Sequence, residues 1–445
     1  MSSSSSEVPV FRVLGDFRVG IDLSSHCDRA VHKEDCMERF FRNPQTIHQK
    51  RQGPLGPYVD DFAQLLSDQG YNRECARRRL RLIAEFSHWL RGRHLTVRDV
   101  TATKMEQFLR ARARPQPIRP GSAGCLKAFF ELLGRKGVAA PLSAVAKTGI
   151  DKVLCDFSLY LQEERVLAAG TIANYLAITK QFLTYRFKTG EINLAALTAA
   201  EVVESVQLFA SSVSRKRAKV MTSALRSFLR YAQYQNLIQS NLAACVPCVA
   251  DWSVASIPKA LPIKHVKRVL ASCNRKNAIG RRDYAILLLL ARLGLRAGEI
   301  CSLQLEDIDW GAGSFTVRGK GGSSAQLPLP ADVGKAIAVY LKNGRPRSLY
   351  RSLFLKTCAP LASLGSGTIG EIVNKALARA GINWSTKGAH QFRHALATKM
   401  LHQGASLAEI GEILRHRHLR TTSIYAKVDI ASLRMLALSW PGGAR

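Results

Sequence analysis

Apolar residues take up helical spacing from Val59 onward, after a polar stretch that is rich in His and Arg and ends in a Gly/Pro cluster at 52–57. Side chains three or four positions apart share one face of a helix, and Pro and Gly interrupt such patterns. The pattern predicts an irregular N-terminal arm at 1–56. It predicts a helical unit at 57–150 that contains a break at 115–120 and an apolar helix ending at Gly134.

Residues 151–245 resemble a second copy of this helical unit. The offset between matching residues drifts only from about 95 to about 99 positions, which is typical of an internal repeat. Tandem all-helical units of similar plan are therefore predicted, although amphipathic helices also match one another by chance. The matching residues are Asp61-Phe62 with Asp156-Phe157, Phe86 and Trp89 with Phe182 and Tyr185, and Leu126 and Phe129 with Leu225 and Phe228.

A Pro-containing linker at 246–262 leads into a third region of different character. Two short strands at 314–318 and 325–329 flank a Gly-rich turn and predict a hairpin. The last helix begins with Ser406 and Glu409 at capping-box spacing. The fold class predicted is therefore mainly α with a small antiparallel β-sheet. Helices are predicted at 263–273, 282–293, around Ile300 and Leu303, and at 331–342, 367–380, 389–402 and 407–415.

The chain is strongly basic and carries its charge throughout. Its 445 residues include 65 Lys+Arg and 33 Asp+Glu, which gives a formal charge of +32. Residues 259–445 have a net charge of +19 and the first 258 residues a net charge of +13. No polybasic tail or single basic amphipathic helix marks a membrane-surface protein. This distribution indicates a protein that contacts many phosphates of DNA or RNA.

Membrane, secretory and metal-binding features are weak. The longest apolar run, 284–291, ends at Arg292 and is too short to span a bilayer, and the N-terminus lacks the pattern of a signal peptide, so we expect a cytoplasmic protein with no membrane partner. The ten cysteines are scattered, which argues against a disulfide scaffold. One CxxC pair, Cys245 and Cys248, has no second pair at zinc-finger spacing, so no metal site is assigned and its role stays open.

Four motifs follow one another in the third region. They are ARLGLRAGEI at 291–300 with Arg296 and Glu299, Gly319-Lys320-Gly321, His390-Gln-Phe-Arg393, and Leu414-Arg415-His416 with Tyr425 nine residues later. In this order they resemble the tyrosine recombinase, or phage integrase, family. The resemblance covers about 260–435 and, more weakly, 151–245, which is similar to the family's helical core-binding domain. It implies a catalytic domain of α+β class at 263–435 and a C-terminal tail at 436–445.

The chemistry of this family requires these residue types. A tyrosine hydroxyl has an ordinary pKa of about 10, so forming its anion at neutral pH costs about 4 kcal/mol unless neighbouring groups help. Guanidinium groups stabilise the extra negative charge on the phosphate oxygens in the transition state. The resemblance implies that Arg296 and Arg393 bind the scissile phosphate, His390 and His416 hydrogen-bond it or move a proton, Lys320 is the general acid, and Tyr425 is the nucleophile.

The covalent bond to tyrosine conserves the energy of the phosphodiester, so the resemblance implies no ATP, no cofactor and no metal. Some of these residues also have ordinary structural interpretations. Glu299 is expected to pair with a nearby cation, Arg296 could cap the helix that ends at Gly294, and Lys320 alone would be an exposed hairpin lysine. The segment after Lys320 lacks the further basic residues common in relatives, and Arg415 stands where relatives often have Gly.

The resemblance implies a site-specific recombinase that acts on double-stranded DNA through a 3′-phosphotyrosyl intermediate, for integration, excision or resolution of a mobile element. A homotetramer in the synaptic complex, or a hetero-assembly with related recombinases, is expected. The first helical unit either binds additional DNA or holds a partner recombinase, and an apolar tail after Tyr425 is expected to dock on a neighbouring protomer. The alternatives are a type IB topoisomerase, which relaxes supercoils, and a non-catalytic DNA-binding regulator.

Overall fold

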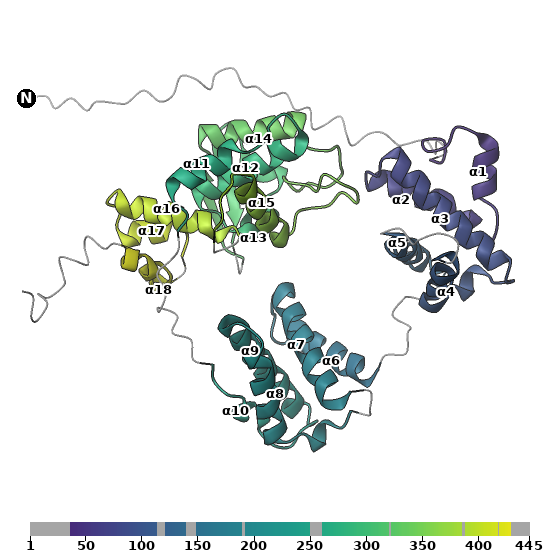
Figure 1. Cartoon of the computed structure of the whole chain (residues 1–445), viewed down its shortest axis with the longest axis horizontal. Helices are drawn as coiled ribbons and strands as arrows, with labels where there is room; N and C mark the ends of the chain where they lie inside the picture. Colours follow the sequence, from purple (N-terminus) through teal and green to yellow (C-terminus); the bar gives the residue numbers. More distant parts are fainter. Residues whose placement is uncertain are drawn as a thin grey trace, which may run out of the picture.

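The protein is mainly helical with one small antiparallel sheet, in agreement with the sequence prediction. Its helices form three groups that follow one another along the chain (Figure 1), and each group encloses an apolar core of its own. In the described part of the chain, no helix has the length and apolar character needed to cross a bilayer. The computed structural model describes residues 36–113, 121–138, 148–188, 192–249, 260–319, 322–384, 388–416 and 418–428.

The first group begins earlier than the sequence predicts. Part of the predicted irregular arm forms helix α1 (Pro44–Lys50), and Phe41 is buried in the core beside it. The Asn43 side chain caps this helix and a proline opens it, but only Ile47 is buried, so no apolar period marks it. The remaining elements are η2 (Gly56–Tyr58), α2 (Val59–Asp68), α3 (Arg73–Arg91), η3 (Val97–Asp99), α4 (Ala102–Ala113) and α5 (Ser122–Arg135).

The second group repeats one aromatic contact of the first. Phe62 meets Phe129 edge-on with ring centroids 5.1 Å apart, and the matching residues Phe157 and Phe228 meet edge-on at 5.3 Å. Both pairs join the first and last long helices of their group, which favours the predicted duplication. The second group contains α6 (Gly149–Glu163), α7 (Ala169–Phe187), η5 (Leu194–Ala196), α8 (Ala199–Ser211), α9 (Arg215–Tyr234) and α10 (Leu242–Cys245).

The third group is built around helix α12 (Ala278–Leu293), which is buried continuously from Ala285 to Leu290. It packs against α14 (Ala331–Asn343) and α16 (His390–His402). The predicted capping box of Ser406 and Glu409 is confirmed at the start of α17. The other elements are α11 (Ile263–Ala271), α13 (Ala297–Ser302), η6 (Leu305–Asp307), α15 (Ser366–Arg379), α17 (Leu407–Ile413), α18 (Leu419–Thr422) and η7 (Ser423–Val428).

The sheet lies in the third group and has the strand order β1-β2-β3. Strands β2 (Ser314–Arg318) and β3 (Ser324–Pro328) form the predicted hairpin, with Phe315 opposite Leu327. The second strand runs one residue earlier than predicted, because Ser324 pairs with Arg318 and Leu329 lies outside the ladder. The short strand β1 (Ile308–Asp309) adds to the other edge of β2. The hairpin turn contains Lys320, which lies outside the described residues.

Candidate active site

A left-handed glycine brings the first predicted arginine into place. Gly294 ends α12 with φ 58°, and Arg296 becomes the N-cap residue of α13 rather than a cap of the preceding helix. A side chain at position 294 would meet Leu414 Cδ2 at 2.9 Å, so the chain after α12 passes close to the segment after α17. Glycine is needed here for both its dihedral angle and its size.

Glu299 holds two arginines in this region. Its side chain is buried, and its carboxylate accepts the backbone N–H of Arg296 at 2.8 Å, Arg296 Nη1 at 2.6 Å and Arg415 Nη2 at 2.9 Å. Burial raises the pKa of Glu299. The Arg296 backbone hydrogen bond and the two guanidinium groups together lower it by more than burial raises it, so the net shift is downward. The expectation that Glu299 pairs with a nearby cation is confirmed.

Arg393 is buried on α16 and ties this helix to two loops. Its Nη1 donates to the Gly294 carbonyl at 2.6 Å, and its Nη2 donates to the Leu414 carbonyl. Burial and the neighbouring Arg296 lower its pKa to about 10, which leaves it charged at neutral pH. Arginine has five N–H donors, so these bonds orient the guanidinium group and leave further donors for an anion.

Two histidines on α16 lie beside Arg393. His390 begins the helix, and His394 follows one turn later with its ring centroid 6.5 Å from that of His390. Burial lowers the pKa of both rings, with Arg393 adding to the effect at His390 and His390 adding to it at His394. Both imidazoles are therefore neutral at pH 7 and can accept a proton or a hydrogen bond.

Tyr425 lies in η7 against these histidines, with only 1% of its surface exposed. Its hydroxyl is 2.9 Å from His394 Nδ1, and its ring lies parallel to that of His416 at 6.5 Å. His416 Nδ1 is 2.7 Å from Thr422 Oγ1, which fixes the imidazole. Burial raises the pKa of Tyr425 to about 12 and, together with Arg393, lowers that of His416 to about 4.

The structure brings five of the six predicted site residues together, and the sixth, Lys320, lies outside the described residues. Sequence analysis missed His394, the hydrogen-bond partner of Tyr425. Its spacing of four residues from His390 places both on one helix face and was the available signal. Sequence analysis also missed the ion pair of Arg415 with Glu299; Arg415 has a positive φ of 55°, a conformation that suits the Gly that relatives often have at this position.

This arrangement is suited to a phosphate group. Three arginines, Arg296, Arg393 and Arg415, surround one buried carboxylate, Glu299, which leaves excess positive charge near Tyr425. Neutral imidazoles stand beside the buried hydroxyl and can take its proton. In the described part of the chain, no three His, Cys, Asp or Glu side chains gather as metal ligands.

Comparison with known families agrees with this chemistry. The model of the "Phage integrase family" matches residues 259–431, and that of the "Phage integrase, N-terminal SAM-like domain" matches residues 154–236. The crystal structure of XerH site-specific recombinase in a post-cleavage complex with palindromic difH substrate superposes with a TM-score of 0.52 at 19% identity, over 75% of this chain and 93% of that one. This structural similarity shows a shared fold.

Two relatives extend the match. Tyrosine recombinase XerC of Bacillus subtilis is 29% identical over 292 residues, which are 64% of this chain and 94% of that protein. The putative integrase/recombinase y4rA of Sinorhizobium fredii is 44% identical over 412 residues, which are 92% of this chain and all of that protein. The second match includes the first helical group as well as the other two. The chain therefore belongs to the phage integrase family of tyrosine recombinases, enzymes that cut and rejoin DNA strands at specific sites through a phosphotyrosyl intermediate.

Proposed function

We propose that Tyr425 is the nucleophile of this recombinase and that Arg296, Lys320, His390, Arg393 and His416 are its catalytic partners. The observation that carries this proposal is the convergence of residues from both ends of the third helical group on one tyrosine. Arg393 links the end of α12 to the segment after α17, and Tyr425 lies against α16 at the same place. Lys320 enters the proposal on its sequence motif alone.

In the proposed cleavage step, the Tyr425 oxygen forms a bond to the phosphorus and the bond from phosphorus to the 5′-oxygen breaks. The tyrosine proton passes to a neighbouring neutral imidazole, for which His394 is closest in this structure at 2.9 Å. Lys320 gives a proton to the departing 5′-oxygen. Arg296 and Arg393 bind the two non-bridging oxygens, whose negative charge grows in the transition state. Rejoining reverses these steps with the 5′-hydroxyl of another strand.

Cleavage requires Tyr425 to leave its buried position. The hydroxyl is enclosed by α16 and α17 and has a raised pKa, so a DNA phosphate does not reach it in this conformation. Movement of η7 toward bound DNA would expose the Tyr425 oxygen to the phosphate while its hydroxyl keeps the hydrogen bond to His394, which can then take the proton. In this conformation the charge of Arg393 offsets part of the rise in the Tyr425 pKa that burial causes. A second guanidinium group near the phosphate would lower this pKa further.

In this proposal, each of the three helical groups corresponds to one domain. The catalytic domain comprises 263–435, the core-binding domain 151–245 joins it through the linker at 246–262, and the unit at 57–150 is a duplicated copy of the core-binding plan. The family matches at 259–431 and 154–236 support the first two assignments, and the repeated aromatic contact supports the third. The tail at 436–445 would dock on a neighbouring protomer.

Four protomers would act on two DNA sites, either as a homotetramer or with related recombinases. The expected setting is the cytoplasm, at the nucleoid, and the expected substrate is the end of a mobile element. The test is a plasmid in which two copies of the DNA flanking the gene enclose a marker. Wild-type protein is expected to delete or invert the marker, and the Arg393→Lys variant to do so at least about 100-fold less, because lysine lacks the planar fork.

The topoisomerase alternative predicts a different outcome. Plasmid lacking the flanking DNA would then be relaxed as fast as plasmid carrying it, with no exchange between sites. A non-catalytic regulator would bind the flanking DNA and neither relax nor recombine the plasmid. Either result would contradict the proposal. The assembly is tested separately, because mass photometry of the protein with its DNA is expected to show four chains per complex.

A further inference from the structure

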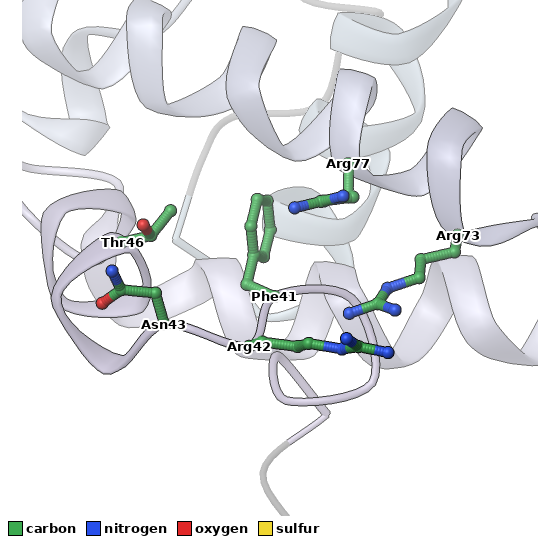
Figure 2. A pocket seen from close by; sticks show the side chains of 6 residues that line it. All are labelled: Phe41, Arg42, Asn43, Thr46, Arg73 and Arg77. Atoms are coloured by element: carbon green, nitrogen blue, oxygen red, sulfur yellow. The ribbon is translucent and has the colours of Figure 1, made fainter.

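A basic pocket lies in the first helical group, far along the chain from the catalytic motifs. It has a volume of about 420 Å³ and is formed between the segment that leads into α1 and the first turns of α3. Figure 2 shows the Arg77 side chain directed toward the Phe41 ring, with Arg42 and Arg73 lining the same pocket. The lining residues are Phe41, Arg42, Asn43, Thr46, Arg73 and Arg77.

The Arg77 side chain lines this pocket, where it packs on an aromatic ring and has an unsatisfied N–H donor. Its guanidinium carbon is 5.3 Å from the centre of the Phe41 ring, so the group is held against an aromatic face. Its Nε atom is buried and has no hydrogen-bond partner among the described residues. A buried donor without a partner costs free energy, which a bound acceptor would recover.

In the described part of the chain, none of the three pocket arginines forms an ion pair with an acid. Arg73 donates from Nε to the Phe40 carbonyl at 3.0 Å, a neutral acceptor that fixes its direction without neutralising it. Several carboxylates of this helical group pair with other arginines, for example Asp60 with Arg51 and Glu74 with Arg78. Three guanidinium groups that converge without a counter-charge repel one another and form a site for an anion.

The geometry favours an extended anion over a small isolated one. Arg73, Arg77 and Arg81 follow each other at intervals of four residues along α3, so they form one line with a rise of about 6 Å per step. Arg81 is exposed beyond the pocket and continues the basic line. A nucleic-acid backbone presents phosphates in such a series, and arginine is well suited to bind them in pairs of hydrogen bonds.

We propose that the pocket formed by Arg42, Arg73 and Arg77 binds a backbone phosphate of DNA outside the segment held by the other two helical groups. The first group then contacts DNA directly and lengthens the bound site, in place of holding a partner recombinase. The proposal rests on the DNA-binding function of the family and not on the assignment of the catalytic residues. Because a backbone contact carries no base sequence, it acts on any duplex.

The test uses the full-length protein and a fluorescent 60-base-pair duplex of mixed sequence. Binding is measured by anisotropy over a range of salt concentrations, and the slope of log K against log salt is compared among variants. The pocket variant is Arg42→Gln/Arg73→Gln, which changes two exposed side chains. The matched control is Arg98→Gln/Arg135→Gln, which removes the same charge from two exposed positions of the same helical group outside the pocket. Thermal unfolding checks that both variants are folded.

The pocket variant is expected to lower the magnitude of the salt slope by about 1 and to weaken binding by about three- to tenfold at fixed salt, because each phosphate contact contributes about 0.9 to the slope. The control is expected to keep the slope of the wild type. Arg77→Lys keeps the charge and loses the planar fork, and it is expected to weaken binding at nearly unchanged slope. Equal slopes for the pocket variant and the control would overturn the proposal.

Two further measurements distinguish DNA from free phosphate as the bound anion, and a failure of this proposal from a failure of the catalytic proposal. Inorganic phosphate that raises the melting temperature of the wild type but not of the pocket variant, together with equal salt slopes on DNA, would assign the pocket to a free anion and overturn the DNA contact. Formation of a covalent protein–DNA adduct is measured on the wild type in parallel. A protein that forms no adduct yet shows the slope difference would contradict the catalytic proposal and support this one.

Discussion

Replacing Glu299 with Gln tests how the site holds its arginines. The substitution keeps the size of the side chain and removes the charge that accepts three hydrogen bonds from Arg296 and Arg415. Breaking one side of a fully buried ion pair costs about 3–5 kcal/mol. The Arg296 side chain is 33% exposed and that of Arg415 16%, so water compensates part of this loss. We expect the free energy of unfolding to fall by about 2–3 kcal/mol.

Calorimetry of the full chain measures this loss as a lower melting temperature of the catalytic domain. A change of 1 kcal/mol shifts the melting temperature of a domain of this size by about 2–4 °C, so the expected shift is about 4–12 °C. The matched control is Glu306→Gln, because Glu306 also pairs with an arginine, Arg351, but has 54% of its side chain exposed. The control is expected to change the unfolding free energy by less than about 0.5 kcal/mol.

The sign of the pH dependence adds a second check on Glu299. Its folded-state pKa is lowered, so its stabilisation is present above the unfolded-state value of about 4.3 and is lost as pH falls through the folded-state pKa. The difference between wild type and Glu299→Gln should therefore shrink in acid. In single-turnover cleavage at saturating DNA, the variant should be about 10- to 100-fold slower, because Arg296 loses its orientation. Wild-type stability together with a wild-type cleavage rate would refute this account.

Three further predictions concern neighbouring residues. His394→Ala removes the acceptor of the Tyr425 proton, and we expect single-turnover cleavage to slow about 10- to 100-fold and to lose its decline in acid, in a rate profile between pH 5 and 8. The pKa of His416, about 4, lies below its ordinary value of 6.5, so between these pH values the unfolded chain binds a proton that the folded chain does not. The free energy of unfolding therefore falls as the pH decreases from 6.5 to 4. Urea unfolding of His416→Gln should show a shallower fall over the same range. Gly294→Ala should cost about 2 kcal/mol because of its positive φ and its contact with Leu414, whereas Gly298→Ala, with open space around it, should cost less than about 0.5 kcal/mol in the same calorimetric assay.

Sequence patterns predicted the long helices of the third group, where apolar residues recur at helical spacing or form a buried run, and predicted the first two groups as helical units. Helix α12 follows directly from the run that ends at Gly294, and the hairpin follows from two short strands around glycines. Helix α1 was not predicted, because seven mostly polar residues with one buried side chain carry no period. Its signals are local, namely the Asn43 cap and the proline that follows it.

The candidate site was predictable only as a set of residue types in order. The position of Arg393 on one helix face with His390 follows from their spacing, but its bonds to the Gly294 and Leu414 carbonyls depend on tertiary packing. The contact between His394 and Tyr425 joins residues 31 positions apart through the placement of η7 against α16. The basic pocket of the first helical group likewise brings together Arg42 and Arg73, which are separated by α1, η2 and α2, and no sequence period encodes this contact.

The most direct test of the central claim is covalent capture of the DNA by Tyr425. A nicked suicide substrate carrying the DNA that flanks the gene is incubated with wild-type protein and with Tyr425→Phe in the presence of EDTA, and the products are separated on a denaturing gel. The account predicts a protein–DNA band for the wild type, none for Tyr425→Phe, and a modified peptide that contains Tyr425. A cut that requires a divalent metal and leaves no adduct, or an adduct that persists in Tyr425→Phe, would contradict it.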